Sequence, residues 1–177
     1  GNKARFDIVL FVNGLPLVVG ETKTAFKQKV SWITAANEVA DHYETKFAPF
    51  FTTNVFSFAT EGRELMYGAT GARVEHWMTG GPTKDHPLLT NVLAAARWLL
   101  APATVLKFLS SFTLFETPED NSGSASLIKL IARYMQFEAV ELMVGRAHAG
   151  QSRRGLIYHT QGSGKTLAMV FAAGQLL

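Results

Sequence analysis

The feature that most constrains the fold is a hairpin signal near the start of the chain. Two β-rich runs, residues 5–12 and 15–23, flank the dipeptide Asn13-Gly14. This dipeptide tolerates the positive φ angles of a two-residue turn, so its position between two such runs predicts an antiparallel hairpin. The chain must therefore bring residues near position 7 back beside residues near position 21.

The region after the hairpin predicts a mixed α/β unit. Ser31 is a suitable N-cap, and apolar residues recur at helical spacing up to about Lys46. Three further β-rich runs are predicted as short strands at residues 50–53, 55–60 and 64–68. A turn-rich stretch then predicts a domain boundary near residue 85.

The second half predicts mainly helices. We expect helices at 88–100, 102–109, 126–148 and 166–177, a loop at 121–124 and a strand at 155–158. The long helix would bury a stripe formed by Leu127, Leu130, Ile131, Tyr134, Ala139, Leu142 and Met143.

Composition excludes several classes of protein. With 47% hydrophobic residues in 177, the chain can bury a core, and zero cysteines exclude disulfides and thiolate metal sites. No apolar run is long enough for a membrane span, and no leader pattern opens the chain, so we expect a cytoplasmic protein without membrane contact. The chain lacks an initiator Met and stops within a predicted helix, which suggests a piece of a longer polypeptide.

The hairpin predicts a cluster of charged side chains. Asp7 lies on its first strand, and Glu21 and Lys23 lie two residues apart on the second, so they point to the same face. Two carboxylates and an ammonium are the groups that phosphodiester hydrolysis needs, because hard oxygen ligands hold Mg²⁺ and the metal activates water. The alternative is a surface ion pair at a strand end. Glu44-Thr45-Lys46 repeats the same three letters on a predicted helix, where residues two apart do not face each other.

A second motif predicts a phosphate-binding loop. His159-Thr160-Gln161-Gly162-Ser163-Gly164-Lys165-Thr166 follows a predicted strand and opens a predicted helix, although its first position is His rather than Gly. Gly162, Ser163 and Gly164 allow backbone N–H groups to surround phosphates. Lys165 would neutralise the phosphate oxygens, and the Thr166 hydroxyl would coordinate Mg²⁺. No apolar run ends in Asp-Glu, so we expect this chain alone not to hydrolyse ATP.

The run RFDIVLFVNGLPLVVGETK at residues 5–23 resembles the nuclease core of type I restriction enzyme R subunits, a branch of the PD-(D/E)xK nucleases. This resemblance implies that Asp7, Glu21 and the backbone carbonyl of Thr22 bind the metal and that Lys23 orients the attacking water. The family often carries Q-x-x-x-Y on the next helix. Here Tyr43 is present and is the one residue carried over, whereas Val39 occupies the Gln position. Either Asn37 or Glu38 substitutes for the Gln, or this branch does without it.

The phosphate loop resembles helicase motif I of the same subunits. The segment RYMQFEAV at residues 133–140 resembles the adenine-reading segment that precedes motif I in superfamily 2 helicases, which makes Gln136 the candidate base reader.

The resemblance implies an α/β fold in which a PD-(D/E)xK restriction-endonuclease-like mixed sheet flanked by helices precedes the beginning of a RecA-like P-loop motor lobe. It places the endonuclease domain at residues 1–85, and linker helices with the truncated start of the helicase domain at 86–177. The implied function is Mg²⁺-dependent cleavage of double-stranded DNA coupled to ATP-driven translocation, with methylation and specificity subunits as partners. Two alternatives remain: another nuclease–helicase fusion in DNA repair or phage defence, and an inactive DNA-binding or assembly module.

Overall fold

A five-stranded mixed sheet forms the centre of the molecule. The structure is a computed structural model that describes residues 5–24, 30–81, 88–117, 127–150 and 154–177. The strands follow the order β1-β2-β3-β4-β5, in which β2 and β3 are parallel and the other neighbours are antiparallel. Their bounds are β1 (Ile8–Val12), β2 (Leu15–Thr22), β3 (Phe56–Thr60), β4 (Leu65–Gly68) and β5 (Met78–Thr79).

The predicted hairpin is confirmed. β1 and β2 meet at Asn13 and Gly14, whose φ angles are 51° and 81°. Both angles are positive, as the two-residue turn requires. A register shift between Leu10 and Phe11 interrupts the pairing, and beyond it Ile8 lies opposite Gly20.

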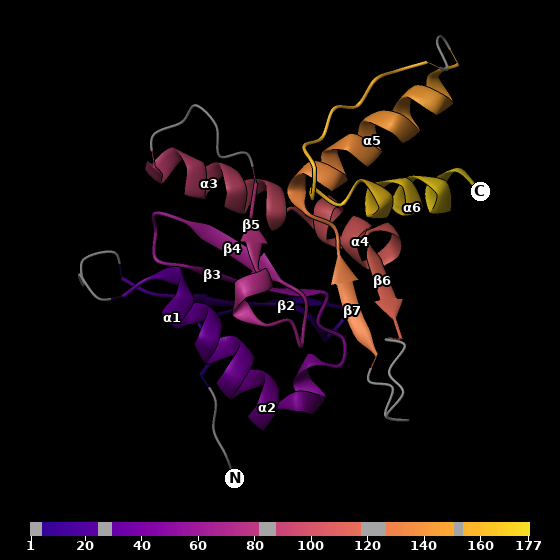
Figure 1. Cartoon of the computed structure of the whole chain (residues 1–177). Helices are drawn as coiled ribbons and strands as arrows, with labels where there is room; N and C mark the ends of the chain where they lie inside the picture. The colour runs from indigo at the N-terminus through magenta and orange to yellow at the C-terminus, as the bar shows by residue number, and fades with distance from the viewer. Residues whose placement is uncertain (1–4, 25–29, 82–87, 118–126, 151–153) are drawn as a thin grey trace.

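One face of the sheet is covered by a helical segment that connects β2 to β3 (Figure 1). It consists of α1 (Trp32–Asn37), a π-helix (Glu38–Tyr43), α2 (Glu44–Lys46) and a 3-10 helix (Ala48–Phe51). Another 3-10 helix (Val74–His76) precedes β5. Buried side chains beneath this layer come from both sheet and helix: Val19, Ala35, Ala36, Val39, Tyr43, Phe51, Ala59 and Trp77.

The other face packs against the second half of the chain. Its elements are α3 (Leu88–Leu99), α4 (Pro102–Ser111), β6 (Thr113–Glu116), β7 (Ile128–Ile131), α5 (Tyr134–Ala149) and α6 (Lys165–Leu176). β6 and β7 form a separate antiparallel pair, and α5 and α6 lie side by side (Figure 1). The predicted helices at 88–100, 102–109 and 166–177 are confirmed within a residue or two at each end.

The two halves share one hydrophobic core. Phe56 of β3 and Tyr67 of β4 lie edge-on to Phe108 of α4. The Tyr67 hydroxyl donates a hydrogen bond of 2.7 Å to the carbonyl of Ala132, which lies between β7 and α5. The boundary predicted near residue 85 and the loop predicted at 121–124 lie outside the described residues.

Three predicted elements are wrong: the strand at 50–53, the first part of the helix at 126–148 and the strand at 155–158. Residues 50–53 do not form a strand, because Pro49 lies in the first turn of the 3-10 helix Ala48–Phe51 and Phe50 stacks on Phe6 at 4.8 Å. The first part of the predicted helix at 126–148 is strand β7, which pairs with β6, and the helix begins only at Tyr134. Its predicted buried stripe holds only in part, since Ile131 and Ala139 are buried whereas Leu127 and Leu142 are exposed.

The segment at 155–158 is extended but unpaired. Leu156 and Tyr158 are 92% and 84% exposed, and no described strand lies beside them. The apolar run predicted a strand, but a strand forms only where a neighbour supplies hydrogen bonds.

Within the described residues, no single helix is both long and apolar enough to cross a bilayer. Among the described helices, one bent pair, Val92–Leu99 and Pro102–Ser111, reaches that length and composition together, with a bend of 58° between its halves.

Candidate functional site

The predicted charged residues meet at one end of the sheet, where β1 begins and β2 and β3 end. Because Ile8 pairs with Gly20, the preceding Asp7 lies next to Glu21. Strand alternation puts Glu21 on the same face as Val19, which is the face covered by the α1 and π-helix layer. The hairpin register therefore brings the carboxylates together, as the sequence predicted.

Glu21 is a buried carboxylate with one oxygen unused. Its side chain is 4% exposed, and its Oε1 accepts a hydrogen bond of 2.7 Å from the Lys23 ammonium. Its Oε2 is buried without a hydrogen-bond partner. Burial raises the pKa of Glu21, an effect that the hydrogen bond from Lys23 opposes and the charges of Glu38 and Asp7 reinforce. A cation at Oε2 would supply the missing partner.

Asp7 lies at the exposed edge of the same cluster. Its Oδ2 accepts hydrogen bonds from the backbone N–H of Thr22 at 3.0 Å and from the Thr22 hydroxyl at 2.9 Å. These bonds fix the orientation of the carboxylate. They also tie Thr22, whose carbonyl is the third predicted ligand, to the first strand.

Lys23 is held between two carboxylates. Its ammonium forms ion pairs with Glu21 and with Glu38 of the π-helix. Burial alone would lower the pKa of Lys23, but the hydrogen bonds to these two glutamates outweigh burial and raise it. The same hydrogen bond from Lys23 lowers the pKa of Glu38. Lys23 is therefore a fixed positive charge and not a proton acceptor at neutral pH.

Tyr43 joins this network through an unusual helical turn. Its hydroxyl lies 3.0 Å from Glu38 Oε1 and 3.1 Å from the carbonyl of Arg5. Glu38 precedes Tyr43 by five residues, and the π-helix over Glu38–Tyr43 brings residues five apart together. Of the two residues named as substitutes, Glu38 contacts Lys23 and Tyr43, whereas Asn37 is exposed. The four-residue spacing pointed to Val39, which is buried in the core instead.

The donor set fits a hard divalent cation. Among the described residues, no three Asp, Glu or His side chains form a group that could hold a metal by themselves. Both oxygens of Glu38 are used, Oε2 by Lys23 and Oε1 by Tyr43. This leaves Asp7 and Glu21, and Mg²⁺ typically binds through one or two carboxylates and keeps several waters.

The second Glu-Thr-Lys copy forms no such cluster. Glu44 Oε2 accepts the backbone N–H of Gly71 at 2.7 Å, whereas Lys46 contacts the His42 ring at 2.8 Å. The two side chains thus have different partners, as expected for residues two apart on a helix.

The predicted phosphate loop has the backbone of a tight turn at the start of α6. Gly162 and Gly164 have φ angles of 76° and 75°. The Lys165 ammonium reaches back to the carbonyls of His159 and Thr160, at 3.1 and 3.2 Å, and Thr166 is exposed. Lys165 therefore lies against the loop that it is predicted to serve.

Gln136 lies beneath this loop and is 1% exposed. Its Oε1 accepts the N–H of Arg133 at 2.9 Å, and its Nε2 lies 3.1 Å from each of the carbonyls of Ser163 and Gly164. Both ends of the amide are thus bonded to backbone.

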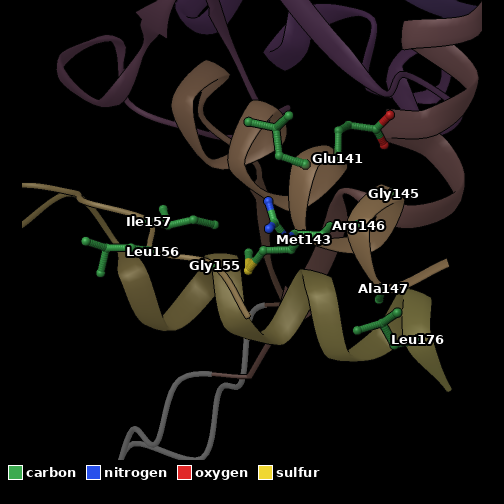
Figure 2. A pocket seen from close by; sticks show the side chains of 10 residues that line it. Glu141, Met143, Gly145, Arg146, Ala147, Gly155, Leu156, Ile157 and Leu176 are labelled. Carbon is green, nitrogen blue, oxygen red and sulfur yellow. The ribbon is translucent and has the colours of Figure 1, made fainter. Parts of the chain in front are cut away.

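A pocket between α5, residues 155–157 and the end of α6 lies apart from these residues (Figure 2). Its lining is largely apolar and includes Met143, Leu156, Ile157 and Leu176. None of the predicted site residues lines it.

Comparisons with known proteins match both halves of the chain. Residues 1–76 match the family model of the type I restriction enzyme R protein N terminus, and residues 135–177 match that of the SWI2/SNF2 ATPase. The HindI endonuclease subunit of a type I restriction enzyme from Haemophilus influenzae is 32% identical over 100% of this chain and 17% of its own length.

Further relatives have the same kind of name. A putative type I restriction enzyme MjaVIIP endonuclease subunit from Methanocaldococcus jannaschii is 29% identical, over 98% of this chain and 17% of the relative. The type I restriction enzyme SsaAORF53P endonuclease subunit from Staphylococcus saprophyticus is 27% identical, over 99% of this chain and 18% of the relative. The chain thus spans about one sixth of the length of these relatives.

Proposed function

Because residues 1–76 belong to the family of type I restriction enzyme R protein N termini, we propose that this chain carries the Mg²⁺-dependent DNA-cleaving site of such an enzyme. The observation that carries the proposal is the buried, unpartnered Oε2 of Glu21 beside Asp7. A buried carboxylate oxygen without a partner is costly, and a bound cation would remove that cost.

Asp7 and Glu21 would hold the cation together with the carbonyl of Thr22. When bound, Mg²⁺ would polarise the phosphodiester and lower the pKa of a bound water. The hydrogen bonds from Thr22 to Asp7 orient that carboxylate before any metal arrives. Asp7, Glu21 and Glu38 bring three carboxylates to the cluster against the single ammonium of Lys23, so the cluster has net negative charge and favours a cation.

Lys23 would orient the attacking water and attract the phosphate. Since its pKa is raised, it contributes a positive charge and does not remove the proton. Glu38 and Tyr43 would fix the position of that charge, because Lys23 donates to Glu38 and Glu38 accepts from Tyr43.

The second half would bind ATP through Gly162, Ser163, Gly164, Lys165 and Thr166. The similarity of residues 135–177 to the SWI2/SNF2 ATPase supports this assignment. In the whole enzyme, ATP-driven translocation along double-stranded DNA would be coupled to cleavage, and methylation and specificity subunits would select the target.

One rival function has an observation in its favour. The double ion pair of Lys23 could hold the strand end and helix together without any metal, as expected of an inactive DNA-binding or assembly module. Metal binding separates the two. A nuclease–helicase fusion outside restriction systems is the other rival, and co-purification with methylation and specificity subunits tests it.

The test is calorimetric titration of Mn²⁺ into the wild type and three variants that each replace a carboxylate by its amide. Asp7→Asn and Glu21→Gln change the proposed ligands. Glu44→Gln is the matched control, since Glu44 belongs to the second Glu-Thr-Lys copy on α2. Circular dichroism verifies that all four proteins are folded.

We expect the two ligand variants to lose at least about tenfold in Mn²⁺ affinity and the control to bind like the wild type. Equal affinities in all four proteins, or no binding by the wild type, would favour the inactive module.

A further inference from the structure

The side chain of Gln136 is fully engaged with the backbone of the phosphate loop. The amide Nε2 donates to the carbonyls of Ser163 and Gly164, and Oε1 accepts from Arg133. The residue is 1% exposed. To read a nucleotide base, this amide would have to break its hydrogen bonds to both loop carbonyls, and the buried carbonyl of Ser163 would lose the donor that Gln136 supplies. Leaving a buried carbonyl without that donor costs more than one exposed hydrogen bond returns.

The fit between Gln136 and the loop is close. Gly164 has a φ of 75°, and a Cβ at this position would lie 2.3 Å from Gln136 Nε2. The amide therefore contacts the loop where its backbone is left-handed, at the residue before the first turn of α6. The carbonyl of Gly164 also accepts the N–H of Ala168, so one contact fixes both the loop and the start of the helix.

The base of this contact is anchored on the central sheet. Arg133, whose N–H binds Gln136 Oε1, follows Ala132, whose carbonyl accepts the Tyr67 hydroxyl of β4 at 2.7 Å. Phe137, the next residue, stacks on Phe112 at a ring distance of 4.1 Å. Gln136 thus projects toward the loop from a rigid, buried junction.

We propose that Gln136 is a positioning residue that braces the phosphate loop through the carbonyls of Ser163 and Gly164 and does not read the nucleotide base. The proposal rests on the proposed ATP site. It changes the role of Gln136 there from a base contact to a support of the loop that holds the phosphates.

The experiment compares Gln136→Glu with Gln161→Glu in the 177-residue chain. Gln136→Glu keeps the acceptor for Arg133 but cannot donate to the two loop carbonyls when ionised. Gln161→Glu adds the same charge at an exposed position of the same loop. Gln136→Met, which is neutral and of similar size, is the second variant if the first does not fold.

The main measurement is amide hydrogen exchange at Ser163 and Ala168, whose N–H groups bond within the loop and the first helical turn. We expect exchange roughly tenfold faster in Gln136→Glu and wild-type exchange in Gln161→Glu. Equal exchange in both variants would overturn the brace.

Calorimetry with Mg²⁺-ATP and Mg²⁺-GTP tests base reading separately. The brace predicts that Gln136→Glu changes the two affinities by the same factor. A loss of ATP preference in this variant alone would overturn the proposal. Failure of the wild type to bind either nucleotide would count against the ATP site, while the exchange rates would still decide whether Gln136 braces the loop.

Discussion

Replacing Glu38 by Gln is the most direct test of the ion-pair network around Lys23. The Gln oxygen can still accept a hydrogen bond, but of the two ion pairs of Lys23 only the one with Glu21 remains. The side chains of Lys23 and Glu38 are 23% and 36% exposed. Ion pairs this accessible contribute about 0–1 kcal/mol, so we expect the free energy of unfolding to fall by less than about 1 kcal/mol.

The effect on the proposed site should exceed the effect on stability. Without the charge of Glu38, the Lys23 ammonium is attracted to Glu21 alone and competes with the metal for that carboxylate. Loss of a group that orients a metal site typically costs about 10–100-fold in affinity or activity. We expect plasmid cleavage by an R subunit with this sequence to fall by about that factor in Glu38→Gln.

Glu141→Gln provides a matched control. It removes the carboxylate of the Lys107–Glu141 ion pair, whose side chains are 47% and 33% exposed, away from the site. Amine-reactive labelling followed by mass spectrometry should show faster modification of Lys23 only in Glu38→Gln and of Lys107 only in the control. Unchanged labelling of Lys23, or an equal loss of cleavage in both variants, would refute the reasoning.

Three further variants test the fold around the site by urea denaturation. Gly20→Ala should lower the free energy of unfolding by about 1–3 kcal/mol or more, because its Cβ would lie 2.1 Å from the buried Phe58 ring, which is 1% exposed. Adding Phe58→Leu should restore part of this stability. Tyr67→Phe should cost roughly 1–3 kcal/mol, since the buried carbonyl of Ala132 loses its donor. Burial raises the pKa of Glu44 from 4.5 to about 7, so the folded state binds this proton more tightly. The stability that Glu44 contributes is complete below pH 4.5 and is lost as the pH rises through 7, and Glu44→Gln should remove this part of the pH dependence.

Local signals predicted the hairpin and the carboxylate cluster correctly. The Asn13-Gly14 turn fixes the register, and the two-residue period of a strand then determines which side chains share a face. Asp7 and Glu21 could be brought together on this basis without any knowledge of the remaining fold. The second Glu-Thr-Lys sequence, at Glu44–Lys46, lies on a helix. Its Glu and Lys side chains therefore point in different directions and bond to different partners.

The errors concern elements whose form depends on distant partners. The run at Ile128–Ile131 is apolar, short and compatible with either a helix or a strand. It is a strand because Thr113–Glu116 lies beside it, and nothing near it in the sequence reveals that neighbour. The segment at 155–158 also depends on a partner. Its residues resemble a strand, but it forms none because no described strand lies beside it.

The position of Glu38 could not be predicted from residue spacing alone. An α-helix places residues four apart on one face, which pointed to Val39, whereas the π-helix moves this relation to residues five apart. The wider turn leaves Val39 in the core and turns Glu38 toward Lys23. A signal was nevertheless present, since Glu38 is a charged residue one position from the expected Gln.

Aromatic side chains of the shared core connect the central sheet to the helix that carries Gln136. Phe56 and Tyr67 of the sheet pack on Phe108, and Phe108 packs in turn on Phe137, the residue after Gln136. The helix start that supports the phosphate loop thus packs on the cluster that covers one face of the sheet, whereas Glu21 lies on the opposite face, over the second cluster. The order of the motifs in the sequence gives no sign of this link; it follows from aromatic residues that are far apart along the chain and adjacent in the core.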